Sequence, residues 1–231
     1  MMSKLFRDFS RKLRAPINRA VAIKKLNKFH QTDRNIREIV DTGIELGTRG
    51  LYKVNSVQKR SEILNLVEHV YELSPENVLE IGTYNGGTLF MWANITKKKV
   101  VTCDLRNPSH RVDLYKKFTP GTSKCKVVAL EGDSHDDEFM KSVHREFENE
   151  KLDFLFIDGD HTEKGVEADF YNYKDMVRKG GIIAFHDILQ NQPVEGNQVY
   201  YFWKKVKDKY KHEEFVDDAD QCGFGIGILY M

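Results

Sequence analysis

Short apolar runs alternate with amphipathic segments along most of the chain. Segments with helical spacing of apolar residues, such as 56–73 and 163–177, lie before and between these runs. The apolar runs, which are typical of buried strands, lie at 77–81, 99–103, 126–130, 152–157 and 182–185. Parallel strands covered on both faces are continuously apolar and need helical crossovers, so this order predicts a doubly wound parallel sheet.

Both ends of the chain depart from this alternation. Residues 33–46 predict another helix before the first strand, and 199–210 predict a helix after the last parallel strand. Beyond it, 214–216 and 224–230 predict a closing antiparallel hairpin. The expected fold class is therefore α/β: a Rossmann-like, doubly wound, mostly parallel seven-stranded sheet with a C-terminal antiparallel hairpin. We expect residues 1–50 to form an N-terminal helical extension and 51–231 the main domain.

The N-terminal segment is strongly basic. Between Met1 and Lys28 there are nine Lys or Arg residues and one acid, Asp8, and apolar residues recur at near-helical intervals on both sides of Pro16. This pattern predicts two short basic amphipathic helices. They could attach to an anionic membrane surface or polymer. Alternatively, they form an arm that packs on the domain or on a second subunit, which is the reading we favour and which makes a homo-oligomer the expected state.

Composition narrows the possible partners. The chain has 231 residues, 40% of them apolar and 31% charged, with a net charge of +1. This balance gives no global field for nucleic acid, so none is expected as a partner. Three cysteines without CxxC spacing fit a reducing compartment, and the chain lacks the roughly 18 consecutive apolar residues that span a bilayer. We expect a cytoplasmic protein.

Polar residues follow each of the five apolar strands. In parallel sheets, ligands bind beyond the carboxyl ends of the strands. Acidic side chains are poor strand formers and costly to bury, so their recurrence at one edge indicates function, although each one alone could be a helix cap. In chain order these residues are Glu80, Asp104, Asp133 with Ser134, Asp158 with Asp160, and His186 with Asp187.

The glycine turn after the first strand predicts a nucleoside-bearing cofactor. Asp104 lies 22 residues beyond Gly82, where a carboxylate can accept hydrogen bonds from ribose hydroxyls. The turn lacks the GxGxxG spacing, and Glu80 would lie close to a pyrophosphate, so a cationic cofactor without phosphates suits the turn better. Two alternatives remain open: an NAD-dependent oxidoreductase, and a non-catalytic adaptor that binds the cofactor.

Three motifs together resemble class I S-adenosylmethionine-dependent methyltransferases. They are Glu80-x-Gly82-x-x-x-Gly86, the FIDGDH sequence at 156–161, and the GGIIAFHD sequence at 180–187. The last two are similar to the subgroup that includes macrocin O-methyltransferase and cephalosporin hydroxylase-like proteins. The resemblance covers about Ser56 to the C-terminus. It implies metal-assisted O-methyl transfer from S-adenosylmethionine to a hydroxylated small molecule, most plausibly a sugar or glycan unit.

The resemblance also implies roles for individual residues. The divalent metal would be held by Asp158, His186 and Asp187, and Asp160 or His161 would be the catalytic base. His186 stands where the family commonly has an acid; imidazole suits Mn²⁺, Fe²⁺ or Zn²⁺ better than Mg²⁺. Mg²⁺ is still our expectation, because His186 could turn aside. The implied cofactor residues are Glu80, Gly82, Thr83, Tyr84 and Gly86 near the methionine end, Asp104 at the ribose, Asp133 and Ser134 at the adenine, and Asp158 beside the metal.

Overall fold

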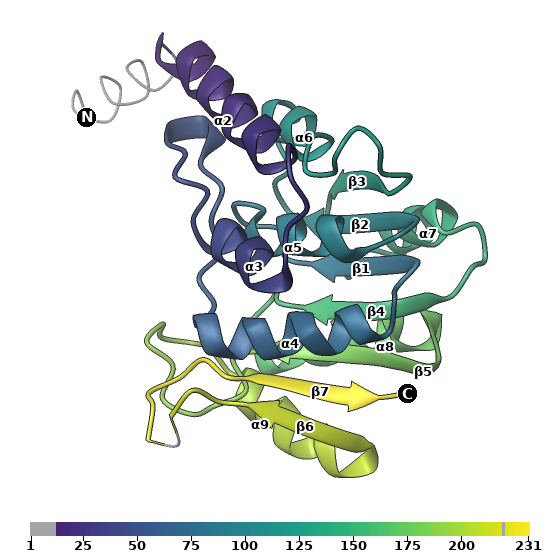
Figure 1. Cartoon of the computed structure of the whole chain (residues 1–231). Coiled ribbons are helices and arrows are strands. Elements are labelled where there is room, and N and C mark those ends of the chain that lie inside the picture. The colour runs from purple at the N-terminus through teal and green to yellow at the C-terminus, as the bar shows by residue number, and fades with distance from the viewer. Residues whose placement is uncertain (1–12, 219) are drawn as a thin grey trace, which may run out of the picture.

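A computed structural model describes residues 13–218 and 220–231. Among these residues the strands form one seven-stranded sheet in the order β3-β2-β1-β4-β5-β7-β6 (Figure 1). Only β7 runs against its neighbours, pairing antiparallel with both β5 and β6. The predicted fold class is confirmed. The strands are β1 (Asn77–Ile81), β2 (Lys99–Asp104), β3 (Lys126–Glu131), β4 (Leu152–Ile157), β5 (Val177–His186), β6 (Lys211–Phe215) and β7 (Ile226–Tyr230).

Helices cover both faces of the sheet. One face packs against α2 (Ala15–Phe29), α3 (Ile36–Ile44), α4 (Arg60–Glu72) and α5 (Gly87–Ile95), and the other against α7 (Asp137–Glu146), α8 (Glu163–Tyr173) and α9 (Val199–Val206). Helix α6 (Ser109–Tyr115) follows β2, and 3-10 turns occupy Gly50–Tyr52, Lys174–Met176 and Lys207–Lys209. Within the described ranges, no helix is both long and apolar enough to cross a membrane.

The core consists of two apolar clusters, one on each side of the sheet. Successive strand residues point to opposite faces, so neighbours in sequence join different clusters. In β1, Val78 packs with α4 and α5 whereas Leu79 packs with α8, and both side chains are fully buried. Burial on both sides explains why the parallel strands are continuously apolar in sequence.

Helix α2 packs on the same core as the main domain. Ala22, Leu26 and Phe29 recur at helical spacing and are buried in the cluster that contains α5. The ring of Phe29 meets that of Phe90 edge-on, with centroids 5.0 Å apart. The structure thus joins the predicted extension to the domain through buried side chains. The first predicted basic helix lies outside the described residues, and the boundary at residue 50 stays a prediction.

Two elements differ from the sequence-based expectations. Helix α6 has no counterpart among the elements predicted from the sequence; it has only seven residues and no side-chain cap, so its sequence signal is short. Strand β5 begins at Val177, where a continued helix was expected, because Val177 pairs with Leu152 before a register shift. Gly180, with a φ of +78°, lies within the irregular part of β5.

The contact at Gly87 generates a test of the packing. A Cβ there would lie 2.3 Å from the backbone nitrogen of Ser56 and 2.4 Å from the carbonyl oxygen of Gly43. Backbone atoms cannot yield cheaply, so Gly87→Ala is expected to lower the free energy of unfolding by about 1–3 kcal/mol in urea titrations. Gly121 is the matched control, since its Cβ would meet nothing within 4 Å. Equal effects of Gly87→Ala and Gly121→Ala would contradict this account.

Candidate active site

A cavity of about 550 Å³ opens at the carboxyl ends of β1 to β4. It lies where the chain order of the strands reverses, with β2 on one side of β1 and β4 on the other. The cavity therefore lies at the edge of the sheet where the sequence predicts ligand binding. Its lining includes eight of the residues proposed from sequence, namely Gly82, Tyr84, Asp104, Asp133, Ser134, Asp158, Asp160 and His161.

The glycine turn brings β1 against the end of β4. Gly82 has a φ of +98°, and a Cβ on it would lie 2.0 Å from the carbonyl oxygen of Asp158. Only glycine permits this approach, because it lacks the Cβ that would collide. The turn therefore leaves bare backbone beside Asp158 in the cavity wall.

Asp104 fixes the conformation of this turn. Its Oδ2 accepts hydrogen bonds from the backbone nitrogens of Thr83 and Tyr84, both at 2.9 Å, and its Oδ1 accepts one from Arg106 at 3.0 Å. Carboxylate oxygens each have two acceptor positions, so Asp104 retains one, on Oδ1, for a ribose hydroxyl. Its location in the wall beside the turn is compatible with the predicted role.

Glu80, Thr83 and Gly86 support the turn from behind. The fully buried Glu80 carboxyl accepts hydrogen bonds from Trp92 Nε1 at 2.9 Å and from Thr102 Oγ1 at 2.6 Å. Thr83 Oγ1 lies 2.7 Å from Thr102 Oγ1, which extends this network. None of the three contributes to the cavity lining in the described ranges. Their assignment as cofactor contacts stays a prediction.

Two carboxylates and two imidazoles converge beside the turn. His161 Nε2 lies 3.4 Å from Asp158 Oδ1 and 3.3 Å from Asp187 Oδ2. His186 Nδ1 lies 3.3 Å from Asp158 Oδ1 and 3.2 Å from Asp187 Oδ1. The side chain of His161 is 42% exposed, whereas that of His186 is 3% exposed. Of these two imidazoles, that of His161 is therefore the one that a ligand in the cavity can reach.

The charges in this cluster are strongly coupled. Hydrogen bonds with Asp158 and Asp187 raise the pKa of His161 to about 10. Burial would lower the pKa of His186, but the attraction of the same two carboxylates outweighs it and raises the pKa to about 10. Burial would raise the pKa of Asp187, yet its contacts with both imidazoles hold it below the usual value. The carboxylates thus create a strong local demand for positive charge.

The donor set fits a divalent metal ion. One ligand atom each from Asp158, His161 and Asp187 lies within 4.8 Å of the other two. Asp187 has a φ of +64°, an uncommon conformation for a residue other than glycine, which directs its side chain at the end of β5. The predicted ligands Asp158 and Asp187 are therefore adjacent. His186 also faces them, but His161, which the resemblance assigns to catalysis, completes the more accessible set.

Two residues that the sequence analysis missed orient the carboxylates. Gln58 Nε2 donates to Asp158 Oδ2 at 2.6 Å, and Asn197 Nδ2 donates to Asp187 Oδ2 at 2.6 Å. Gln58 precedes α4 and Asn197 precedes α9, outside every motif. No signal in a single sequence identifies amides that become neighbours only in the folded chain.

A carboxyl group that the sequence did not indicate, that of Asp169, contacts residues of the cavity lining. Asp169 in α8 is fully buried, and its Oδ1 accepts a hydrogen bond from Ser134 Oγ at 2.7 Å. His135 Nε2 lies 3.1 Å from the same oxygen. Burial raises the pKa of Asp169 to about 6. Asp169 therefore fixes Ser134 and His135, at the end where adenine is expected.

The two candidate bases, Asp160 and His161, have different roles in the structure. Asp160 Oδ1 accepts a hydrogen bond from the backbone nitrogen of Thr162 at 2.8 Å, an arrangement typical of an Asx turn. Thr162 in turn caps α8 by accepting from Gly165 at 3.0 Å. Asp160 thus organises the start of α8, although it borders the cavity. His161, whose imidazole faces both carboxylates, is the better placed candidate.

One protein family and one curated relative match part of this chain. Residues 79–188 match the family model described as a methyltransferase domain. This part of the chain is therefore similar to methyltransferase domains, in line with the resemblance drawn from the sequence motifs. A curated relative, uncharacterized protein R132 of Acanthamoeba polyphaga mimivirus, is 30% identical over 128 residues, which is 54% of this chain. The matched region spans 57% of the relative's length.

Solved structures share the fold at low sequence identity. An O-methyltransferase from Bacillus cereus, in complex with SAH (S-adenosylhomocysteine), has a TM-score of 0.55 at 16% identity, covering 87% of this chain and 93% of its own. CalS11, a TDP-rhamnose 3'-O-methyltransferase of calicheamicin biosynthesis, has a TM-score of 0.53 at 14% identity, and the match covers 90% of this chain and 92% of CalS11. MycE of the mycinamycin pathway, in complex with Mg, SAH and mycinamycin VI, has a TM-score of 0.51 at 20% identity. The match covers 72% of this chain and 48% of MycE. This chain thus spans about half of MycE.

Glu80 generates a test through the pH dependence of stability. Burial raises its pKa from 4.5 to about 8, despite hydrogen bonds from Thr102 and Trp92. Between these values the folded protein keeps a proton that the unfolded chain loses, so this group makes the free energy of unfolding fall as pH rises. Glu80→Gln is expected to remove on the order of 3 kcal/mol of that decline. Urea titrations from about pH 5 to 8 measure it.

The control for this test is Glu138→Gln, which alters an exposed acid on α7. It should leave the wild-type slope of stability against pH in place. If Glu80→Gln and the wild type have the same slope, Glu80 is ionised in the folded protein, and the account of the buried acid is wrong.

Proposed function

We propose that this chain transfers the methyl group of S-adenosylmethionine to a hydroxyl oxygen of a small molecule, with a sugar or glycan unit as the favoured acceptor. The observation that carries the proposal is that Asp158 and His161 line the same cavity as Gly82 and Asp104. A methyl donor at the glycine turn and an acceptor at the carboxylate cluster would therefore be neighbours. Methyl transfer requires this proximity, because the acceptor oxygen must meet the methyl carbon in line.

The cavity residues suit each part of the cofactor. Bare backbone at Gly82 admits the methionine portion, the Asp104 carboxylate receives a ribose hydroxyl, and Asp133 with Ser134 borders the adenine. S-adenosylmethionine, when bound, supplies an electrophilic methyl group on a positively charged sulfur. The nearby carboxylates of Asp158 and Asp187 favour that charge. A dinucleotide, which brings two phosphates, would meet the same carboxylates unfavourably.

Asp158 and Asp187 would hold a divalent ion, with His161 beside it. Such an ion, when bound, would lower the pKa of an acceptor hydroxyl and fix its position. We propose Mg²⁺, because the two carboxylates provide hard oxygen donors and the half-exposed His161 can leave its position to water. Gln58 and Asn197 keep the carboxylates oriented through their hydrogen bonds.

His161 is the proposed general base. Its imidazole is held at the cavity by Asp158 and Asp187, within reach of an acceptor that occupies the cluster. The charges of these carboxylates raise the pKa of His161. Neutralising them would return the pKa toward its ordinary value, where imidazole can accept a proton near pH 7.

Two of the structural neighbours support the choice of acceptor and metal. CalS11 is a TDP-rhamnose 3'-O-methyltransferase, and MycE forms a complex with Mg and SAH. A sugar hydroxyl and Mg²⁺ are therefore reasonable first candidates for this chain. The low identity of both neighbours means that the acceptor has to be found by experiment.

Cofactor choice is tested by titration calorimetry with S-adenosylhomocysteine and with NAD. We expect S-adenosylhomocysteine to bind and NAD to give no heat. Asp104→Asn keeps an acceptor oxygen for the turn but removes the charge, so it should weaken binding by about tenfold or more. Asp113→Asn, an exposed acid in α6, is the control and should bind as the wild type. NAD binding instead would favour the oxidoreductase alternative.

Reaction and metal are tested with labelled methyl donor and a panel of sugar-containing acceptors. EDTA should abolish transfer, and Mg²⁺ should restore it. Asp187→Asn should reduce transfer by about 100-fold or more, because it removes a negative charge from the ion site while keeping the side-chain shape. Glu138→Gln provides the activity control. Cofactor binding without transfer to any acceptor would favour the adaptor alternative, and transfer that resists EDTA would exclude the metal.

A further inference from the structure

The nearly neutral chain combines a basic arm with an acidic remainder. Residues 1–32 contain nine Lys or Arg and one acid, which leaves 27 Lys or Arg and 34 Asp or Glu for residues 33–231. Net charge alone conceals this division. The N-terminal arm is therefore the part of the chain suited to an anionic partner.

Helix α2 uses only one of its faces to pack on the domain. Ala22, Leu26 and Phe29 are buried, and Lys25 Nζ donates to the carbonyl oxygen of Leu46 at 3.0 Å. These residues account for the inner side of the helix. The opposite side carries Lys24 and Lys28, and α2, with the sequence APINRAVAIKKLNKF, contains no acidic residue.

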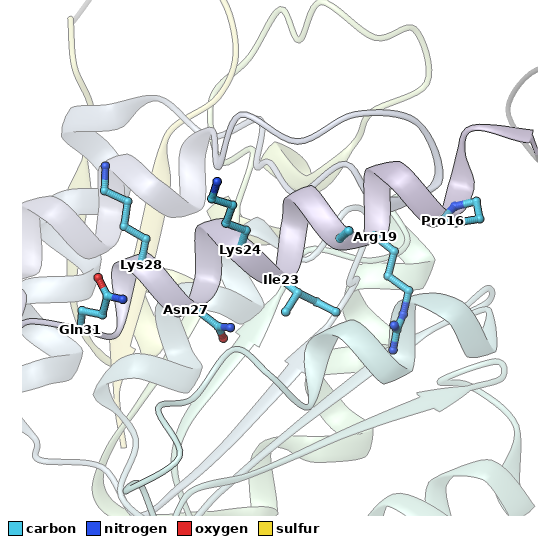
Figure 2. Close-up of a pocket in the computed structure, with 8 residues that line it drawn as sticks. Pro16, Arg19, Ile23, Lys24, Asn27, Lys28 and Gln31 are labelled. Atoms are coloured by element: carbon cyan, nitrogen blue, oxygen red, sulfur yellow. The ribbon is translucent and has the colours of Figure 1, made fainter.

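The outer face of α2 combines cations with exposed branched apolar side chains. Figure 2 shows Lys24 and Lys28 projecting from one side of α2, with Arg19 on the other. Ile17 is 67% exposed and Val21 41% exposed in the same helix, and Leu13 just before it is 63% exposed. Within the described parts of the chain, no ion pair joins Arg19, Lys24 or Lys28 to an acid. In the described part of the chain, these cations therefore form no ion pair, and these apolar side chains are largely outside the core.

We propose that this face docks on a membrane surface that contains anionic lipid. Lys24 and Lys28 would reach lipid phosphates, while Ile17 and Val21 on the same side of the helix would enter the boundary between head groups and acyl chains. The apolar side chains decide between partners, because they gain nothing on the phosphates of a nucleic acid. The acidic remainder of the chain would be repelled by the same surface, which orients the molecule with α2 toward the lipid. This inference is independent of the proposed methyl transfer.

Vesicle co-sedimentation of the full chain tests the proposal. Wild type should bind vesicles with about one third phosphatidylserine and should not bind pure phosphatidylcholine. Salt at about 0.5 M should release it. Lys24→Glu and Lys28→Glu combined should lower the partition coefficient about 100-fold or more. Ile17→Ser with Val21→Ser should also weaken binding, in this case without a change in net charge.

A matched control carries the same charge change elsewhere. Lys97→Glu and Lys124→Glu combined alter two exposed lysines outside α2 and should keep binding within a few-fold of wild type. Melting temperatures should be unchanged in every variant, because all altered side chains are exposed. Equal binding by the two double variants would overturn the proposal. So would self-association or RNA binding by a wild type that ignores anionic vesicles.

Discussion

The contact between the β1 turn and the end of β4 determines the geometry of the site. At Gly82 the turn lies so close to the Asp158 carbonyl that no Cβ fits between them. Asp104 holds the following residues of the turn by two backbone hydrogen bonds. One edge of the cavity therefore combines bare backbone with a carboxylate. The glycine turn and the acid cluster become neighbours because two strands share this edge.

Charge compensation explains the second half of the site. Asp158 and Asp187 are largely buried carboxylates, and burying such charges is costly unless they are paired. Two imidazoles and two amides provide the pairing in the structure. Since His161 is also half exposed, one of the pairing groups is accessible to a ligand. The same electrostatic demand would favour a divalent ion or a sulfonium.

Much of the fold was predictable because the strongest signals are local. Apolar runs and glycine punctuation placed β1 and β4 at their observed limits, and acidic residues at strand ends identified the cavity edge. The sequence could not place Gln58, Asn197 or Asp169 in the site, since their partners are distant in sequence or lie on other elements. Nor could it show that Glu80 points behind the turn, because strand residues adjacent in sequence face opposite ways.

The central claim is that methyl donor and divalent ion share one cavity. A crystal structure with S-adenosylhomocysteine and Mn²⁺, located by its anomalous scattering, tests this most directly. The account predicts the sulfur beside Gly82, the ribose on Asp104, and the ion between Asp158 and Asp187. A cofactor outside the cavity, or an anomalous peak away from both carboxylates, would contradict it.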